Sequence, residues 1–142
     1  MTSGVIITNG KLILGCRPFG KKRDKNFLDI PKGIIEENET ALDACIRETK
    51  EEVNIDINKN ILKDLGEFEY LEEKNLHLFL YKLHTEHLPN TGSMRCNSYF
   101  EMNGKKLPEM ISMQYVHKRN VANLFRYKIA GILVSLIENE VF

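Results

Sequence analysis

The sequence predicts a single α/β domain over residues 1–142, in which a mixed β-sheet lies between helices. Two long stretches, 39–53 and 121–138, have helical periodicity, and each gathers its apolar side chains on one side, where they can pack on a sheet. The remaining runs are β-rich and are separated by turn signals, which is the element order of an α/β sandwich. A chain of 142 residues is long enough to bury one substantial core.

The first half of the chain begins with a predicted hairpin. Residues 3–8 and 11–16 are β-rich runs joined by Asn9-Gly10, the strongest short hairpin signal. A basic loop at 17–25 follows, and its composition is typical of an exposed turn that could also supply cations to a phosphate.

The next expected elements are a short strand at 27–30 and the first helix. We expect this helix to start at Asn38 or Glu39 and to run to about Val53, because Asn is a good N-cap and an acid in the first turn suits the helix dipole.

The second half is predicted to contain further strands and a terminal helix. The strands are expected at 62–70, 76–83, 94–102, 105–107 and 109–116, with turns at 72–75 and at Asn103-Gly104. The terminal helix at 121–138 is expected to cap the face of the sheet opposite the first helix.

Composition excludes several classes of protein. Lys plus Arg and Asp plus Glu are equal at 20 each, so no basic footprint for non-specific nucleic-acid binding exists, and a polynucleotide substrate would have to be gripped at an end. The apolar stretch 129–137 is too short to span a bilayer, and the N-terminus lacks a signal-peptide pattern. Three cysteines suit reduced thiols, so we expect a cytoplasmic protein. The oligomeric state stays open, a homodimer included.

The first helix carries an acidic face. Glu48, Glu51 and Glu52 fall at i, i+3 and i+4, so they share one side of the helix, and Arg47 stands four residues before Glu51. A solvated charged face is the alternative interpretation, although such faces usually mix signs. Carboxylates that repel on adjacent turns favour a bound hard divalent cation, and Gly33 would allow close backbone approach to it.

Residues 33–55 resemble the Nudix box, the signature of the Nudix hydrolases. The pattern consists of Gly33, five residues, Glu39, seven residues, Arg47-Glu48, two residues and Glu51-Glu52. Two positions depart from the family pattern, Thr49 in place of an aliphatic residue and Asn54 in place of glycine. The Thr49 hydroxyl can bond a carbonyl one turn back, and Asn is a common left-handed residue at a helix end.

The resemblance implies a Nudix-type α/β/α sandwich and hydrolysis of a phosphoanhydride that joins a nucleoside diphosphate to another group, with Mg²⁺ or Mn²⁺. The implied metal ligands are Glu48, Glu51, Glu52 and the Gly33 carbonyl, joined by Glu109 as in bacterial RNA 5′-pyrophosphohydrolases. The implied catalytic residues are Glu51, Glu52, Arg47 and Glu109, with Arg47 orienting a carboxylate and a carboxylate not saturated by metal taking a proton from water. For Glu109, an exposed acid at a strand start is the alternative.

Substrate choice rests on fewer residues. The residues that lead into the box, Pro31-Lys32-Gly33, are similar to those at this place in dinucleoside polyphosphate and cap hydrolases. The candidate substrate-binding residues are Arg17, Lys32 and Tyr70. The leading expectation is cleavage of dinucleoside polyphosphates or of 5′-polyphosphorylated RNA ends. The alternatives are an ADP-ribose or (d)NTP pyrophosphatase and a nucleotide-binding module without turnover.

Overall fold

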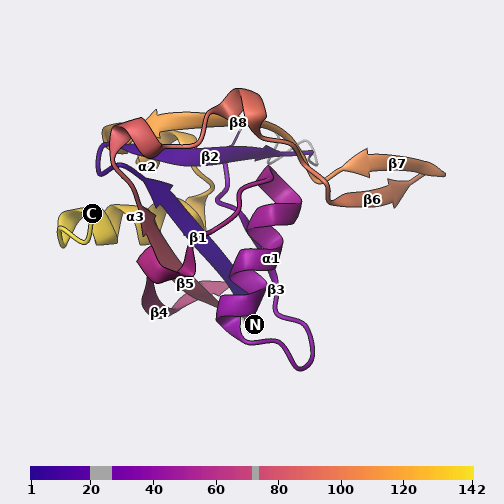
Figure 1. Cartoon of the computed structure of the whole chain (residues 1–142), viewed down its shortest axis with the longest axis horizontal. Coiled ribbons are helices and arrows are strands. Elements are labelled where there is room, and N and C mark those ends of the chain that lie inside the picture. The colour runs from indigo at the N-terminus through magenta and orange to yellow at the C-terminus, as the bar shows by residue number, and fades with distance from the viewer. Residues whose placement is uncertain (20–26, 72–73) are drawn as a thin grey trace.

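The computed structural model describes residues 1–19, 27–71 and 74–142. It shows a mixed six-stranded sheet with helices on both faces (Figure 1), so the predicted α/β sandwich is confirmed. The strands are β1 Thr2–Thr8, β2 Leu12–Pro18, β3 Lys32–Ile34, β4 Leu62–Leu71, β5 Lys74–Lys82, β6 Tyr99–Met102, β7 Lys105–Pro108 and β8 Met110–His117. The helices are α1 Ala41–Val53, α2 Val121–Leu124 and α3 Tyr127–Glu138, with short 3₁₀ turns at Lys59–Ile61, Thr85–His87, Thr91–Ser93 and Lys118–Asn120.

Strand β1 is the centre of the sheet. The strand order is β4-β5-β1-β2-β8, with β3 also paired to β1. The β1–β5 pair is parallel and the others are antiparallel. All seven residues of β1 are buried, because helices and loops cover both of its faces.

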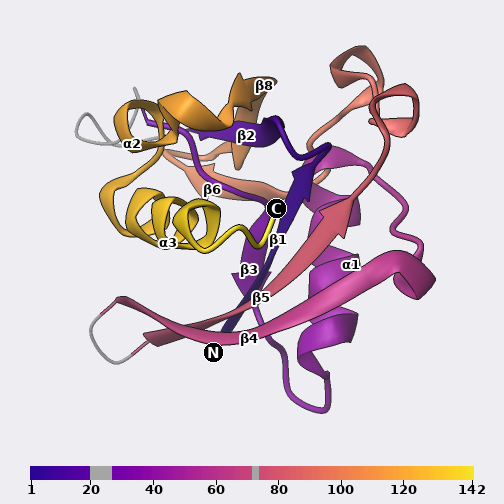
Figure 2. The same cartoon turned by 90° about the vertical axis from the view of Figure 1, so that its left-hand side faces the viewer.

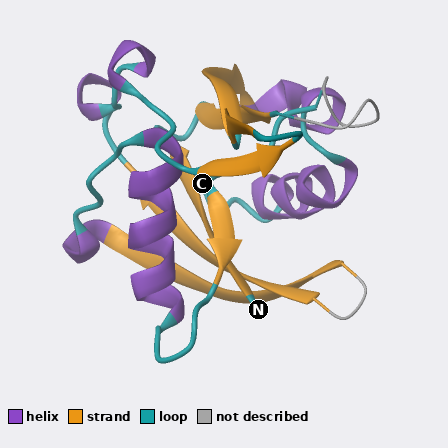
Figure 3. Cartoon of the chain, turned by 90° about the vertical axis from the view of Figure 1, so that its right-hand side faces the viewer, coloured by secondary structure: helices purple, strands orange, loops and turns teal. Residues whose placement is uncertain are grey.

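Alternate side chains of β1 enter two separate cores. Ile6 belongs to the core that contains α3, whereas Val5 and Ile7 belong to the core that contains α1. The two helices therefore lie on opposite faces of the sheet (Figures 2 and 3), as predicted for the terminal helix.

Helix α1 begins later than predicted. Asn38 adopts a left-handed φ of 64°, which is incompatible with an N-cap, and Thr40 caps the helix in a capping box with Asp43 instead. The predicted end at Val53 is confirmed, with Asn54 left-handed at φ 59°. The Thr49 hydroxyl donates to the Cys45 carbonyl at 2.6 Å, also as predicted.

Two predictions fail for one physical reason. The strand expected at 27–30 consists only of isolated bridges, and the helix expected at 121–138 is broken between α2 and α3. The Leu28 amide donates to the Leu124 carbonyl at 2.8 Å, and the Arg126 amide donates to the Leu28 carbonyl at 2.9 Å. These bonds hold Phe125 extended, with φ −92° and ψ 155°, so the helix has to restart at Tyr127.

Strand β3 was not predicted, because residues 31–33 were expected to form a turn, whereas Lys32–Ile34 pairs with β1. The remaining strands agree with prediction except at one boundary. The strand expected at 94–102 is limited to β6, because the preceding residues bond elsewhere, with the Asn97 amide on the Glu51 carbonyl. β6 pairs with β7 through the predicted Asn103-Gly104 turn, and the two form a separate arm that projects from the body (Figure 1). Residues 20–25 of the basic loop and 72–73 of the predicted turn lie outside the described residues. No helix in the described parts of the chain is long and apolar enough to cross a membrane.

Candidate metal and catalytic site

The site begins where the β3 backbone meets helix α1. A Cβ atom built on Gly33 would overlap the carboxylate of Glu48, so only glycine allows this approach. Burial raises the pKa of Glu48, and the charges of Glu51 and Glu109 act in the same direction, while Arg47 opposes the rise.

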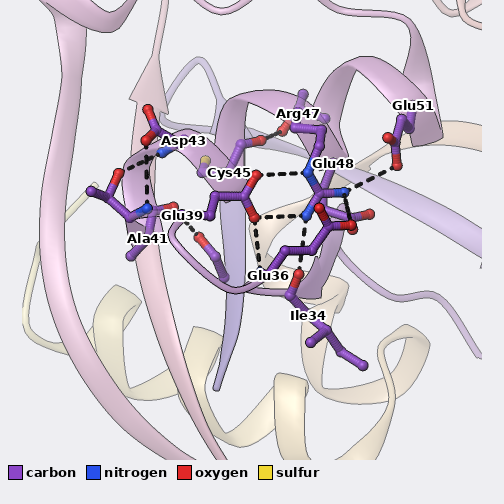
Figure 4. Close-up of polar contacts among 12 residues, drawn as sticks. Ile34, Glu36, Glu39, Ala41, Asp43, Cys45, Arg47, Glu48 and Glu51 are labelled. Carbon is purple, nitrogen blue, oxygen red and sulfur yellow. Dashed lines mark hydrogen bonds and ion pairs between the residues drawn. The ribbon is translucent and has the colours of Figure 1, made fainter.

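Arg47 fixes the acidic face of α1 to the preceding loop (Figure 4). Its guanidinium donates twice to Glu39, at 2.8 and 2.9 Å, and once to the Ile34 carbonyl, at 3.1 Å. It also donates to Glu48 at 2.8 Å and, as the i, i+4 spacing predicted, to Glu51 at 3.3 Å. The hydrogen bonds from Arg47 lower the pKa of Glu39 to about 2. This fork of donors holds Glu48 in one orientation.

Glu52 is the most buried carboxylate of the three box glutamates. Its residue is 2% exposed, and Oε1 accepts the Lys32 amide at 2.8 Å. Burial raises its pKa to about 9, and the nearby charges of Glu48 and Glu109 add to the effect. A carboxylate that is costly to ionise in the protein alone is a natural ligand for a cation, which favours the ionised form.

Two further acidic residues, Glu51 and Glu109, come from distant parts of the chain. The Glu51 side chain is 41% exposed and points to Arg47 and solvent, and its carbonyl accepts the Asn97 amide. Glu109 directly precedes β8, and its carbonyl accepts the Phe19 amide at 2.9 Å. The charge of Glu109 raises the pKa of Glu48 and of Glu52, so its carboxylate lies within electrostatic range of both.

The donor set fits a hard divalent cation. All the candidate ligands are oxygens, and the Gly33 backbone comes against a carboxylate that any side chain would displace. Within the described ranges, no group of three His, Cys, Asp or Glu side chains is gathered into a closed ligand set. Glu48 and Glu51 are instead held by Arg47, and Glu52 by the Lys32 amide.

The Lys32 side chain makes two contacts that the sequence did not predict. Its ammonium pairs with Asp29 at 3.0 Å and lies 5.3 Å from the centre of the Tyr70 ring, so two of the three substrate-binding candidates do meet. Asp29, 1% exposed, also accepts Arg126 at 3.0 Å, and sequence reasoning missed both residues. The available signal was a charged residue within the apolar run 27–30.

Arg17 is placed by strand alternation. Cys16 enters the core shared with α1, so Arg17, the next residue of β2, faces the other side of the sheet. The chain shifts register after Arg17, at Pro18.

The fold and the site define an α/β sandwich with a carboxylate cluster on the helix that follows a glycine-containing strand. The family model described as NUDIX domain matches residues 1–99. The chain belongs to the Nudix family.

The chain is also similar to a bacteriophage protein. A protein of Enterobacteria phage T4, described as an uncharacterized 17.7 kDa protein in the e-segB intergenic region, is 45% identical over 85 residues. That match covers 58% of this chain and 56% of the phage protein, so it spans little more than half of either.

Solved structures share the fold at low identity. An Ap4A hydrolase of C. elegans superposes with a TM-score of 0.69 at 21% identity, over 99% of this chain and 98% of its own. A bifunctional NMN adenylyltransferase/ADP ribose pyrophosphatase of Francisella tularensis, complexed with AMP and a Mn ion, gives 0.70 at 18% identity, over 97% of this chain and 41% of its own.

Proposed function

We propose that this protein hydrolyses a phosphoanhydride bond in a nucleoside diphosphate linked to another group, with Mg²⁺ or Mn²⁺. The observation that carries the proposal is the contact of the Gly33 backbone with Glu48, next to buried Glu52 and braced by Arg47. A binding module without turnover has no need to bury and brace so many carboxylates.

Each residue has a role that follows from its contacts. Glu48, Glu51, Glu52, Glu109 and the Gly33 carbonyl would hold the cation, which supplies charge neutralisation on the phosphates and lowers the pKa of bound water. Arg47 keeps the Glu48 carboxylate aimed at the site through bonds anchored on Glu39. A box carboxylate not saturated by the cation accepts the proton of the attacking water.

The substrates we favour are dinucleoside polyphosphates and 5′-polyphosphorylated RNA ends. A pocket of about 330 Å³ lies on the α3 side of the sheet, and its lining includes Tyr70, Phe27 and Tyr127, a set of rings suited to a nucleobase. Lys32 links this pocket to the carboxylates, because its amide bonds Glu52 while its ammonium lies over Tyr70. The similarity to an Ap4A hydrolase over almost the whole chain supports the same choice.

A substrate panel tests the proposal. Diadenosine polyphosphates, triphosphorylated RNA, ADP-ribose, NADH and nucleoside triphosphates are incubated with the protein and Mg²⁺ or Mn²⁺, with EDTA as the metal-free control. We expect metal-dependent cleavage, with the highest kcat/KM on a dinucleoside polyphosphate or an RNA end. A higher kcat/KM on ADP-ribose or a triphosphate would replace the favoured substrate class, and no cleavage of any compound would contradict the enzymatic assignment.

A further inference from the structure

The two strands at the ends of the order β4-β5-β1-β2-β8 differ in how they are protected, while the short strand β3 pairs with β1 off this path. Strand β4 forms one edge and carries four charged residues, Lys63, Asp64, Glu67 and Glu69. Its pairing with β5 shifts register at Gly66, where φ is 87°, and again before Leu71. Charges and bulges of this kind prevent an edge strand from pairing with another chain.

Strand β8 forms the other end of this order, and its pairing with β2 shifts register once, near its N-terminal end, between Ser112 and Met110. Residues Met110–Val116 contain no charged residue and no proline. Among the described strands β8 pairs only with β2, and it lies at the margin of the sheet in Figure 2. Ile111 is 51% exposed, and Ser112 and Gln114 are exposed as well. A long, uncharged, apolar edge is a template for pairing with a further strand.

We propose that β8 pairs antiparallel with β8 of a second copy of this chain, so that the sheet continues across a two-fold dimer. A two-fold axis through an antiparallel pair places one residue opposite its own copy, and a charged residue there would meet a like charge. The middle of β8, Ser112 to Gln114, is neutral and therefore compatible with self-pairing. The middle of β4 is not, because Asp64 and Glu67 flank it.

The β6–β7 arm supports the choice of a second copy as the partner. The arm ends at Pro108, one residue away from the start of β8, and projects beyond the body (Figure 1). Tyr99 and Met102 on it are 46% and 45% exposed. A two-stranded hairpin alone is marginally stable in water. Antiparallel pairing of β8 brings each arm alongside the other end of the partner's β8, which gives the arm a surface to pack on.

Molar mass in solution tests the proposal. Analytical ultracentrifugation over a range of concentrations should give twice the 16.5 kDa chain mass for the wild type. The double variant Ser112→Lys/Gln114→Lys places lysines opposite lysines whichever central residue lies on the axis, and it should be a monomer. Glu67→Lys/Glu69→Lys, the matched control at the same spacing on β4, should remain a dimer. A monomeric wild type, a dimeric β8 variant or a monomeric β4 control would each overturn the assignment.

Hydrogen exchange on the wild type keeps the test independent of how the variants fold. Amides of β8 should exchange more slowly at concentrations where the dimer forms than after dilution, while those of β4 should not change. Equal protection of β8 at both concentrations would overturn the pairing even if the masses indicate a dimer.

Discussion

Gly33 and Glu48 lie so close that a Cβ atom on Gly33 would occupy the space of the Glu48 carboxylate. The glycine of the box is therefore required by a contact, and its φ lies outside the left-handed region. The contact joins strand β3 to helix α1 at the proposed metal site.

Gly33→Ala should displace the Glu48 carboxylate and weaken metal-dependent turnover by at least about tenfold, the scale typical of losing a residue that orients a ligand. Steady-state kinetics across a Mg²⁺ titration measures the loss as a higher metal requirement. Gly131→Ala is the matched control, because a Cβ there meets nothing within 4 Å. It lies within α3 and should stabilise the fold by about 0.5–1 kcal/mol. Unchanged kinetics in Gly33→Ala would contradict this role.

Arg47→Lys should lower kcat by about 10–100-fold, since an ammonium cannot reproduce the fork of bonds to Glu39, Glu48 and the Ile34 carbonyl. Lys50→Ala is the control on the same helix. The Lys50 ammonium makes an exposed ion pair with Asp56, at 3.1 Å, which contributes less than about 1 kcal/mol. Equal activity of the two variants would show that the bonds of Arg47 have no catalytic consequence.

The metal-free protein should lose stability as the pH rises from about 4.5 to about 9. Burial raises the pKa of Glu52 from 4.5 to about 9 in the folded chain, so the folded state holds a proton that the unfolded chain releases in this window. Urea unfolding in EDTA at several pH values measures the effect.

Glu52→Gln should flatten this decline, and excess Mg²⁺ should reduce it in the wild type, because a cation favours the ionised carboxylate. Glu39 affects stability in a different, more acidic pH range. Its pKa is lowered to about 2, so its contribution is present above about pH 4.5 and is lost only as the pH falls towards 2. If the free energy of unfolding changes with pH to the same extent in the wild type and in Glu52→Gln, the burial of Glu52 is not the cause of the decline.

Asn54→Ala should lower the free energy of unfolding by about 1 kcal/mol, because a left-handed residue with a plain Cβ is strained. Asn54→Gly should not lower it. Equal losses from Asn54→Ala and Asn54→Gly in urea unfolding would refute the explanation.

The residues that the sequence identified best are those with local patterns. The spacing of Glu48, Glu51 and Glu52 determines their common face on any helix, and Asn54 could be recognised as a helix end from its type and position. The hairpin β1–β2 follows from a two-residue turn signal in the same way.

Contacts between distant segments could not be predicted in this way. Leu28 bonds with residues on both sides of Phe125, and neither partner shows any local signal for the other. Asp29, the residue after Leu28, contacts Lys32 and Arg126, and its contact with Arg126 joins the same two distant segments. Lys32 was therefore expected to contact a phosphate, although in the structure its ammonium is paired with the buried carboxylate of Asp29.

The most direct test of the proposed chemistry is the turnover of Glu52→Gln on the best substrate of the panel, with saturating Mg²⁺ and with folding verified by circular dichroism. Glutamine keeps the size of the side chain and an acceptor for the Lys32 amide but removes the charge that would bind a cation. We predict that kcat falls by several orders of magnitude while the fold is retained. Turnover equal to that of the wild type would contradict the assignment of the site to this helix.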